Sequence, residues 1–125
     1  MFPVPVLTLD RLSCKATDVL SRVGEKWSML ILGLLSVRAY GFNELDRTIE
    51  GLSRRILTRT LRTLEREGLV RRTPPADGSQ RVEYVLTELG RSLLPLVVAL
   101  GEWAERHEPA IRQARASYDH GLTGP

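Results

Sequence analysis

The stretch GLSRRILTRTLRTLEREGLVRRT, residues 51–73, contains seven arginines, two glutamates and no lysine. A rotation of about 100° per residue would separate its side chains into two helix faces. One face is apolar or small: Ile56, Leu57, Thr60, Leu61 and Leu64. The opposite face carries guanidinium groups: Arg55, Arg59, Arg62 and Arg66. Ser53 is well placed to cap this helix and Gly68 to end it. We therefore predict a helix over residues 53–67, with one face in the core and the other facing an anion.

Charge is concentrated around this stretch. The 125-residue chain has 42% hydrophobic and 26% charged residues, the composition of an ordinary globular domain, and its length predicts a single domain over residues 1–125. Residues 47–81 hold nine arginines and four acidic residues, a net charge of +5. The remainder holds nine basic and eleven acidic residues, a net charge of −2. This asymmetry predicts a localised contact with a polyanion rather than a diffusely basic surface.

The sequence offers little for a membrane, a metal or a catalytic site. The longest apolar run, MLILGLL at residues 29–35, is too short to span a bilayer, and the N-terminus lacks the pattern of a secretory signal. With Cys14 as its single cysteine, the chain cannot form an intramolecular disulfide. His107 and His120 have no metal-ligand spacing and no nucleophile to serve. We expect a cytoplasmic protein that is not an enzyme, with no cofactor, metal or membrane partner.

The segments around the basic helix predict the remaining elements. After an arm of about ten residues, helices are expected from Ser13 to residue 23, over 25–37 and over 42–49. The runs LVRRT and RVEYVLT, joined by PPADGSQ, predict a β-hairpin over residues 69–86. Thr87 can cap a final helix over residues 87–116. The order predicts a mainly α fold with a small β-hairpin, namely a winged helix-turn-helix over residues 10–86 with a long C-terminal dimerisation helix.

This geometry predicts contacts with DNA. The second helix of a helix-turn-helix enters the major groove with its N-terminal residues toward the base edges. Arginine can hydrogen-bond guanine O6 and N7 with two donors at once, whereas lysine lacks that fork. Base contacts are expected from Arg54, Arg55, Thr58 and Arg59. Backbone contacts are expected from Arg62 and Arg66, and from Arg71, Arg72 and Arg81 in the hairpin. The alternative is a solvated helix face whose arginines pair partly with Glu65 and Glu67.

From Cys14 to about His107 the chain resembles the HxlR-type helix-turn-helix family of bacterial transcription regulators, relatives of the MarR group. The likeness rests on Cys14, GEKWSMLIL, YGFNELDRTIEGLSRRILTRTLRTLEREGLVRR, RVEYVLTELGRSLLP and the Trp103–His107 end. It implies a winged-helix homodimer that binds palindromic operator DNA to repress or activate neighbouring genes. It also implies base contacts from the recognition helix, residues 53–67: Ser53, Arg54, Arg55, Thr58, Arg59 and Arg62. From the wing, which is the hairpin over residues 69–86, it implies a backbone contact by Arg81.

Two positions depart from the pattern of the family. Cys14-Lys15 stands where a Cys-Pro pair is usual, and Ser53-Arg54-Arg55 stands where Ser-Pro-Arg is usual. The second change keeps the capping serine and adds a charge at the start of the recognition helix. It is expected to alter which operator is read.

The final helix has heptad spacing over about three heptads. Part of its apolar face is expected to pack on its own domain, but a chain of this length cannot surround so long a helix. We therefore favour a symmetric dimer interface over residues 93–111, with help from residues 7–20. Its expected contacts are Leu93, Leu96, Leu100, Trp103 and His107.

Regulation of the protein has two candidate sites, each with a simpler alternative. A lone cysteine such as Cys14 is most often a small buried hydrophobe. In family members that this chain resembles, an N-terminal cysteine near the dimer interface senses oxidants or electrophiles. Any disulfide would here join two subunits or a small thiol. Four aromatic residues could line an effector pocket between winged domain and dimer helix, or could belong to the core: Trp27, Tyr40, Tyr84 and Trp103.

Three functions follow from these observations. The favoured one is a sequence-specific, dimeric DNA-binding regulator. The alternatives are a winged-helix module whose basic helix docks on an acidic protein, and a ligand-binding scaffold in which DNA contact is vestigial. A steep dependence of affinity on salt and enrichment of a palindrome would distinguish the first from the others.

Overall fold

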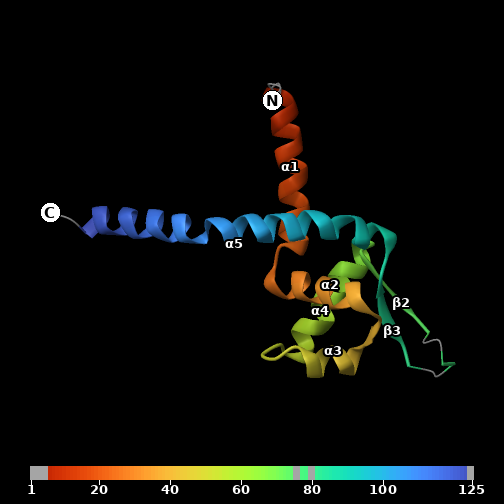
Figure 1. Cartoon of the computed structure of the whole chain (residues 1–125). Coiled ribbons are helices and arrows are strands. Elements are labelled where there is room, and N and C mark those ends of the chain that lie inside the picture. Colours follow the sequence, from red (N-terminus) through yellow and green to blue (C-terminus); the bar gives the residue numbers. More distant parts are fainter. Residues whose placement is uncertain (1–5, 75–76, 79–80, 124–125) are drawn as a thin grey trace. The chain divides into compact units, whose positions relative to one another are not determined.

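The computed structural model describes residues 6–74, 77–78 and 81–123 (Figure 1). The chain divides into two compact units, residues 1–92 and 93–125. The elements in chain order are α1 (Val6–Val23), α2 (Lys26–Val37), β1 (Tyr40–Gly41), α3 (Phe42–Thr48), α4 (Arg54–Arg66), β2 (Val70–Thr73), β3 (Glu83–Leu86) and α5 (Glu88–Thr123). The predicted mainly α fold, with four helices, a hairpin and a long C-terminal helix, is confirmed.

The core of the first unit lies between α2, α3, α4 and the sheet. Its fully buried side chains are leucine, isoleucine and valine, as the two-faced pattern of α4 predicts: Ile31, Leu32, Leu35, Leu45, Leu57, Leu61, Leu64 and Val70. The sequence of α2 is apolar nearly all round, which predicts a helix buried on most sides, but Leu30 and Val37 are exposed and that prediction is wrong. An apolar run marks a helix that has a core face, but it does not show how many neighbours cover the other faces.

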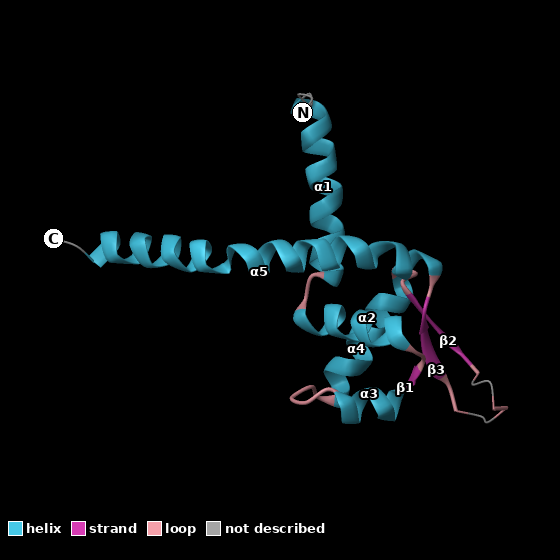
Figure 2. Cartoon of the chain, viewed as in Figure 1, coloured by secondary structure: helices cyan, strands magenta, loops and turns pink. Residues whose placement is uncertain are grey.

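The sheet has three antiparallel strands in the order β1-β3-β2 (Figure 2). β2 and β3 form the predicted hairpin, with Arg72 opposite Tyr84. Tyr40 in β1 lies opposite the same Tyr84 from the other side of β3. β1 was not predicted from the sequence, because a strand of two residues is too short to show an alternation of apolar and polar side chains. Part of the hairpin tip lies outside the described residues.

Two helix boundaries differ from the predictions. α1 begins at Val6 rather than near Ser13. The prolines before residue 6 suggested a longer arm, but nothing between Val6 and Ser13 prevents helix formation. α5 continues to Thr123 rather than ending at residue 116. Residues 117–120 contain no proline that would end the helix earlier.

Thr87 joins the end of the basic helix to the start of the last one. Its hydroxyl donates to the Gly68 carbonyl at 2.6 Å and accepts from the Gly90 N–H at 3.1 Å. Its own N–H donates to the Leu69 carbonyl at 3.0 Å. A Cβ at Gly90 would lie 2.4 Å from that carbonyl oxygen, so only glycine permits this close approach. The predicted cap at Thr87 is confirmed, and it also fixes the exit of α4.

Replacing Thr87 with Val keeps the shape of the side chain but removes both hydroxyl hydrogen bonds. We expect the free energy of unfolding to fall by about 1–2 kcal/mol in urea denaturation, because a cap and a bridge between two elements are lost together. Thr63→Val is the matched control, since the Thr63 hydroxyl donates to the Arg59 carbonyl of its own helix. The control should stay within about 0.5 kcal/mol of the parent. Equal losses in both variants would contradict the bridging role.

Candidate nucleic-acid interface

α3 and α4 form a helix-turn-helix whose turn is anchored by two buried residues. The turn covers residues 49–53, in which Ile49 and Leu52 are buried and Gly51 adopts a φ of +80°. Ser53 caps α4 as predicted, because its hydroxyl oxygen accepts a hydrogen bond from the Ile56 N–H at 3.1 Å. Two apolar anchors and a cap therefore hold the start of α4 in place.

The outward face of α4 is a row of exposed guanidinium groups. Six side chains of this face line a shallow surface hollow of about 420 Å³: Arg55, Thr58, Arg59, Arg62, Thr63 and Arg66. Over the described residues, Arg55, Arg59 and Arg62 take part in no salt bridge. The structure thus brings together the arginines that the sequence placed on one face, with their charges available to a partner.

The two glutamates near the end of α4 pair mostly with other elements. Glu65 accepts from Arg72 Nε of β2 at 3.0 Å. Glu67 lies 3.3 Å from Arg22 of α1 and 3.8 Å from Arg66. Among the four arginines of the outward face, the pairing that the alternative reading expected is therefore seen for Arg66.

Arg54, also expected at the DNA, is turned toward α3. Its Nη1 donates to Asp46 Oδ2 at 3.0 Å and to Asn43 Oδ1 at 3.2 Å. Its guanidinium carbon lies 4.8 Å from the centre of the Phe42 ring. These three partners of Arg54 were not predicted from the sequence. The pair with Asp46 could have been predicted, because an acidic residue near the end of one helix is followed, across a tight turn, by an arginine at the start of the next helix.

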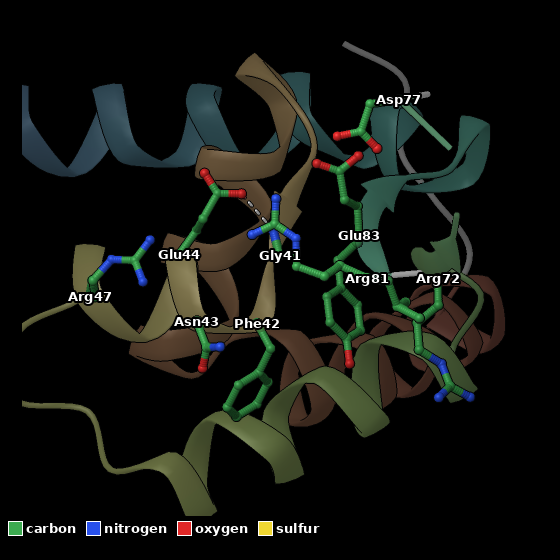
Figure 3. A pocket seen from close by; sticks show the side chains of 11 residues that line it. Gly41, Phe42, Asn43, Glu44, Arg47, Arg72, Asp77, Arg81 and Glu83 are labelled. Carbon is green, nitrogen blue, oxygen red and sulfur yellow. Dashed lines mark hydrogen bonds between the residues drawn. The ribbon is translucent and has the colours of Figure 1, made fainter. Parts of the chain in front are cut away.

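A second hollow, of about 340 Å³, lies where α3 meets the sheet and the wing (Figure 3). It brings together Arg72 and Arg81, both expected at the DNA, with acidic residues among its other lining groups. Figure 3 shows one of these, Glu44, which accepts a hydrogen bond from the Gly41 N–H at 2.9 Å. The wing surface is therefore mixed in charge, unlike the outward face of α4.

Two side chains at this hollow have shifted pKa values. The hydrogen bond from the Gly41 N–H holds the pKa of Glu44 below its ordinary 4.5; burial opposes this effect, and the charge of Arg38 adds to the lowering. Burial, and then the negative charge of Glu65, raises the pKa of the Tyr84 hydroxyl above its ordinary 10.0. Tyr84 therefore stays a neutral hydrogen-bonding group beside the arginines at neutral pH.

Two of the four residues expected at an effector pocket, Tyr40 and Tyr84, are neighbours on adjacent strands. Tyr40 is buried and lies opposite Tyr84 across the sheet. Arg38 covers the Tyr40 ring at 3.8 Å, and Lys26 lies 4.7 Å from the ring centre of Trp27 in α2. Trp103 belongs to the second unit. Tyr84 is the member that lines the hollow of Figure 3. An effector site formed by these four residues stays a prediction.

The second unit and α1 carry exposed apolar groups. Four of the five residues expected at a dimer interface are exposed: Leu96, Leu100, Trp103 and His107. Trp103 stacks on His107 with ring centres 4.6 Å apart, and Leu93 is half-buried. Cys14 is exposed in α1, so the expectation of a buried cysteine is wrong in the single chain. The cause is its place on a helix whose described side chains up to Ser21 are all exposed.

The described part of the chain has neither a metal-binding cluster nor a membrane-spanning helix. No cluster of three histidine, cysteine, aspartate or glutamate side chains there could hold a metal ion. No helix in that part is both long and apolar enough to cross a bilayer.

Known proteins share this arrangement. A family model described as HxlR-like helix-turn-helix matches residues 22–112. An HTH-type transcriptional regulator of Methanothermobacter thermautotrophicus is 39% identical over 98 residues, which cover 78% of this chain and 75% of the relative. The HTH-type transcriptional regulator YtfH of Escherichia coli is 36% identical over 107 residues, covering 83% and 85%. The solved structure of the redox regulator HypR in its reduced form has a TM-score of 0.69 and 32% identity, over 79% of this chain and 98% of that chain. Its oxidised form has a TM-score of 0.65 and 35% identity, over 74% and 96%.

The lowered pKa of Glu44 predicts a stability that depends on pH. Because the folded state favours the ionised carboxylate, the stabilisation is present above pH 4.5 and is lost as pH falls through the lower folded pKa. We expect Glu44→Gln to be less stable than the parent in urea at pH 7, and the difference to vanish in strong acid. Glu50→Gln, which removes an exposed carboxylate of the turn, is the control. A difference that grows on acidification would refute this assignment.

Proposed function

We propose that this chain, which belongs to the HxlR-like helix-turn-helix family, is a sequence-specific DNA-binding regulator that acts as a homodimer on a palindromic operator. Family membership itself makes it a transcriptional regulator of the helix-turn-helix type. The observation that supports DNA binding most directly is the row of arginines on the outward face of α4, of which Arg55, Arg59 and Arg62 form no salt bridge within the described residues. A row of cations along a helix suits an extended polyanion such as a duplex better than a single small ligand.

The proposed contacts divide by their position along α4. Ser53, Arg55, Thr58 and Arg59 lie in the first turns, which approach the base edges when a recognition helix enters the major groove. Arg62 and Arg66 lie further back and are proposed to contact phosphates. In the wing, Arg72 and Arg81 are proposed to reach the neighbouring backbone or minor groove. Arg72 would do so from its ion pair with Glu65, which orients its guanidinium.

Dimerisation is proposed through the apolar side chains of α5 over residues 93–111, with help from residues 7–20 of α1. Leu96, Leu100 and Trp103 are 67%, 51% and 47% exposed, and Leu12 of α1 is also exposed. Large apolar groups exposed on a helix favour burial against a partner, and a two-fold axis lets the same residues serve both subunits. Two recognition helices held about one DNA turn apart, ~34 Å, would then read the two halves of a palindrome.

A redox response is proposed for Cys14. The thiol is exposed in α1, within residues 7–20 that are proposed to help form the dimer interface. Two of the similar structures are the reduced and oxidised forms of a redox regulator. With one cysteine per chain, oxidation would join the Cys14 thiols of two subunits or add a small thiol.

Selection of bound duplexes from a random pool tests the proposed function. We expect enrichment of a palindrome with half-sites about 10 base pairs apart, and an affinity that falls at least tenfold on a modest rise in salt. Enrichment without symmetry would remove the dimeric reading. No enrichment at all would refute operator recognition and favour an acidic protein as the partner of the basic helix.

The selected operator then separates the two groups of arginines. Arg55→Ala should lower operator affinity by about 1–3 kcal/mol and relax the preference at one base pair. Arg62→Ala is the matched change further along the same face. It should weaken operator and random duplex about equally and reduce the salt slope by about one. Equal losses on both duplexes for Arg55→Ala would assign Arg55 to the backbone instead.

Mild diamide treatment tests the role of Cys14. A covalent dimer on a non-reducing gel, or a changed operator affinity without it, should appear in the parent protein and be absent in Cys14→Ser. Reduction should reverse the effect, because disulfide formation is reversible. A treated parent protein that shows neither change would remove the redox response while leaving DNA recognition intact.

A further inference from the structure

Arg54 is paired with another helix of the chain, unlike Arg55, Arg59 and Arg62 of the basic helix. The guanidinium groups of Arg55, Arg59 and Arg62 form no salt bridge within the described residues. Arg54 instead makes two hydrogen bonds to α3 and covers the Phe42 ring. Successive residues on a helix are about 100° apart, so Arg54 and Arg55 project in different directions. One of them meets α3 and the other faces outward.

Three side chains of α3 form the surroundings of the Arg54 guanidinium. Asp46 is mostly covered, with 25% of its side chain exposed, against 62% for Arg54. Asn43 and Asp46 occupy one face of α3, three residues apart, so both oxygens can meet a single nitrogen, Nη1. Phe42 supplies an aromatic ring to the same guanidinium. Three side chains of one short helix therefore converge on the first residue of the next.

The charge of Arg54 needs such a partner. The first turn of a helix has unpaired N–H groups and a partial positive charge, so a cation there is disfavoured. Asp46 supplies the missing negative charge from outside α4. It also neutralises a cation that would otherwise stand at the end of α4 proposed to enter the groove. The ion pair spans the turn at residues 49–53 and ties α3 to α4 at a second point, beside the buried Ile49 and Leu52.

We propose that Arg54 is a positioning residue held by Asp46, not a base-reading one, and that Asp46 thereby determines specificity by withholding this cation from DNA phosphate. This role rests on the proposed function, since it concerns how the recognition helix treats DNA. A cation released near the backbone would add a contact that every sequence offers. Specificity is a difference between two affinities, so an added contact common to all duplexes lowers the advantage of the operator when it disturbs the fit there.

Asp46→Asn tests this role, because it keeps the size of the side chain and removes its charge. We expect affinity for a random duplex to rise about three- to tenfold. The slope of log affinity against log salt should steepen by about 0.9, the contribution of one phosphate contact. Operator affinity should rise less, so that the ratio of operator to random affinity falls severalfold. Asp46→Ala, which also removes the hydrogen-bond acceptor, should show the same changes at least as strongly.

Variants of Arg54 supply the matched controls. Arg54→Gln, and the double variant Asp46→Asn with Arg54→Gln, should both show the parent's salt slope on random duplex, because no cation is left to release. Arg54→Pro removes the side chain at a position where proline suits the helix start, since Ser53 before it is extended with ψ of 154°. Both single variants should retain the parent's preference at every base pair. Circular dichroism and melting temperature verify that each variant is folded.

The outcomes separate this role from the proposed function. An Asp46→Asn variant with unchanged random affinity and slope would overturn it. So would a loss of preference at one base pair in Arg54→Gln and Arg54→Pro, which would make Arg54 a base-reading residue. In both cases the parent still selects its operator, and the proposed function stands. A parent protein that binds no duplex would refute both together.

Discussion

The burial of leucine on one side of α4 determines where the charges of this protein lie. Leu57, Leu61 and Leu64 are almost wholly buried, and three such side chains contribute about 5–9 kcal/mol to folding. An exposed ion pair contributes about 0–1 kcal/mol. The apolar contacts therefore fix the rotation of the helix about its axis. The arginines of the opposite face follow from that rotation, without partners of their own to hold them outward.

Acidic residues are placed so that they stabilise the frame without neutralising this face. Glu65 and Glu67 contact β2 and α1, and Asp46 contacts the first residue of α4. The arginines left facing outward repel one another, but salt at about 0.1 M screens charges more than about 10 Å apart. A core held by leucine can tolerate that repulsion. A helix held in place mainly by surface ion pairs could not keep its arginines unpaired and available to a polyanion.

The sequence predicted what depends on a repeating pattern and failed where a contact is singular. The two faces of α4, its Ser53 cap and the hairpin follow from period and turn chemistry, and the structure has them. β1 is too short to show an alternation, and the sequence did not locate the start of α1 or the end of α5. The exposed Leu30 and Val37 of α2 depend on what does not pack against it. Such absences cannot be predicted from one segment alone.

Arg54 shows why counting charges along a chain overstates what a partner meets. Seven arginines stand in residues 51–73, yet a helix turns each one in a different direction, and its neighbours decide what remains available. Arg54 is held by Asp46, Arg72 by Glu65, and Arg66 lies near Glu67. The charge offered outward is thus smaller and more ordered than the sequence implies. For a protein that must distinguish one duplex from many, a contact that all duplexes offer equally adds affinity without adding discrimination.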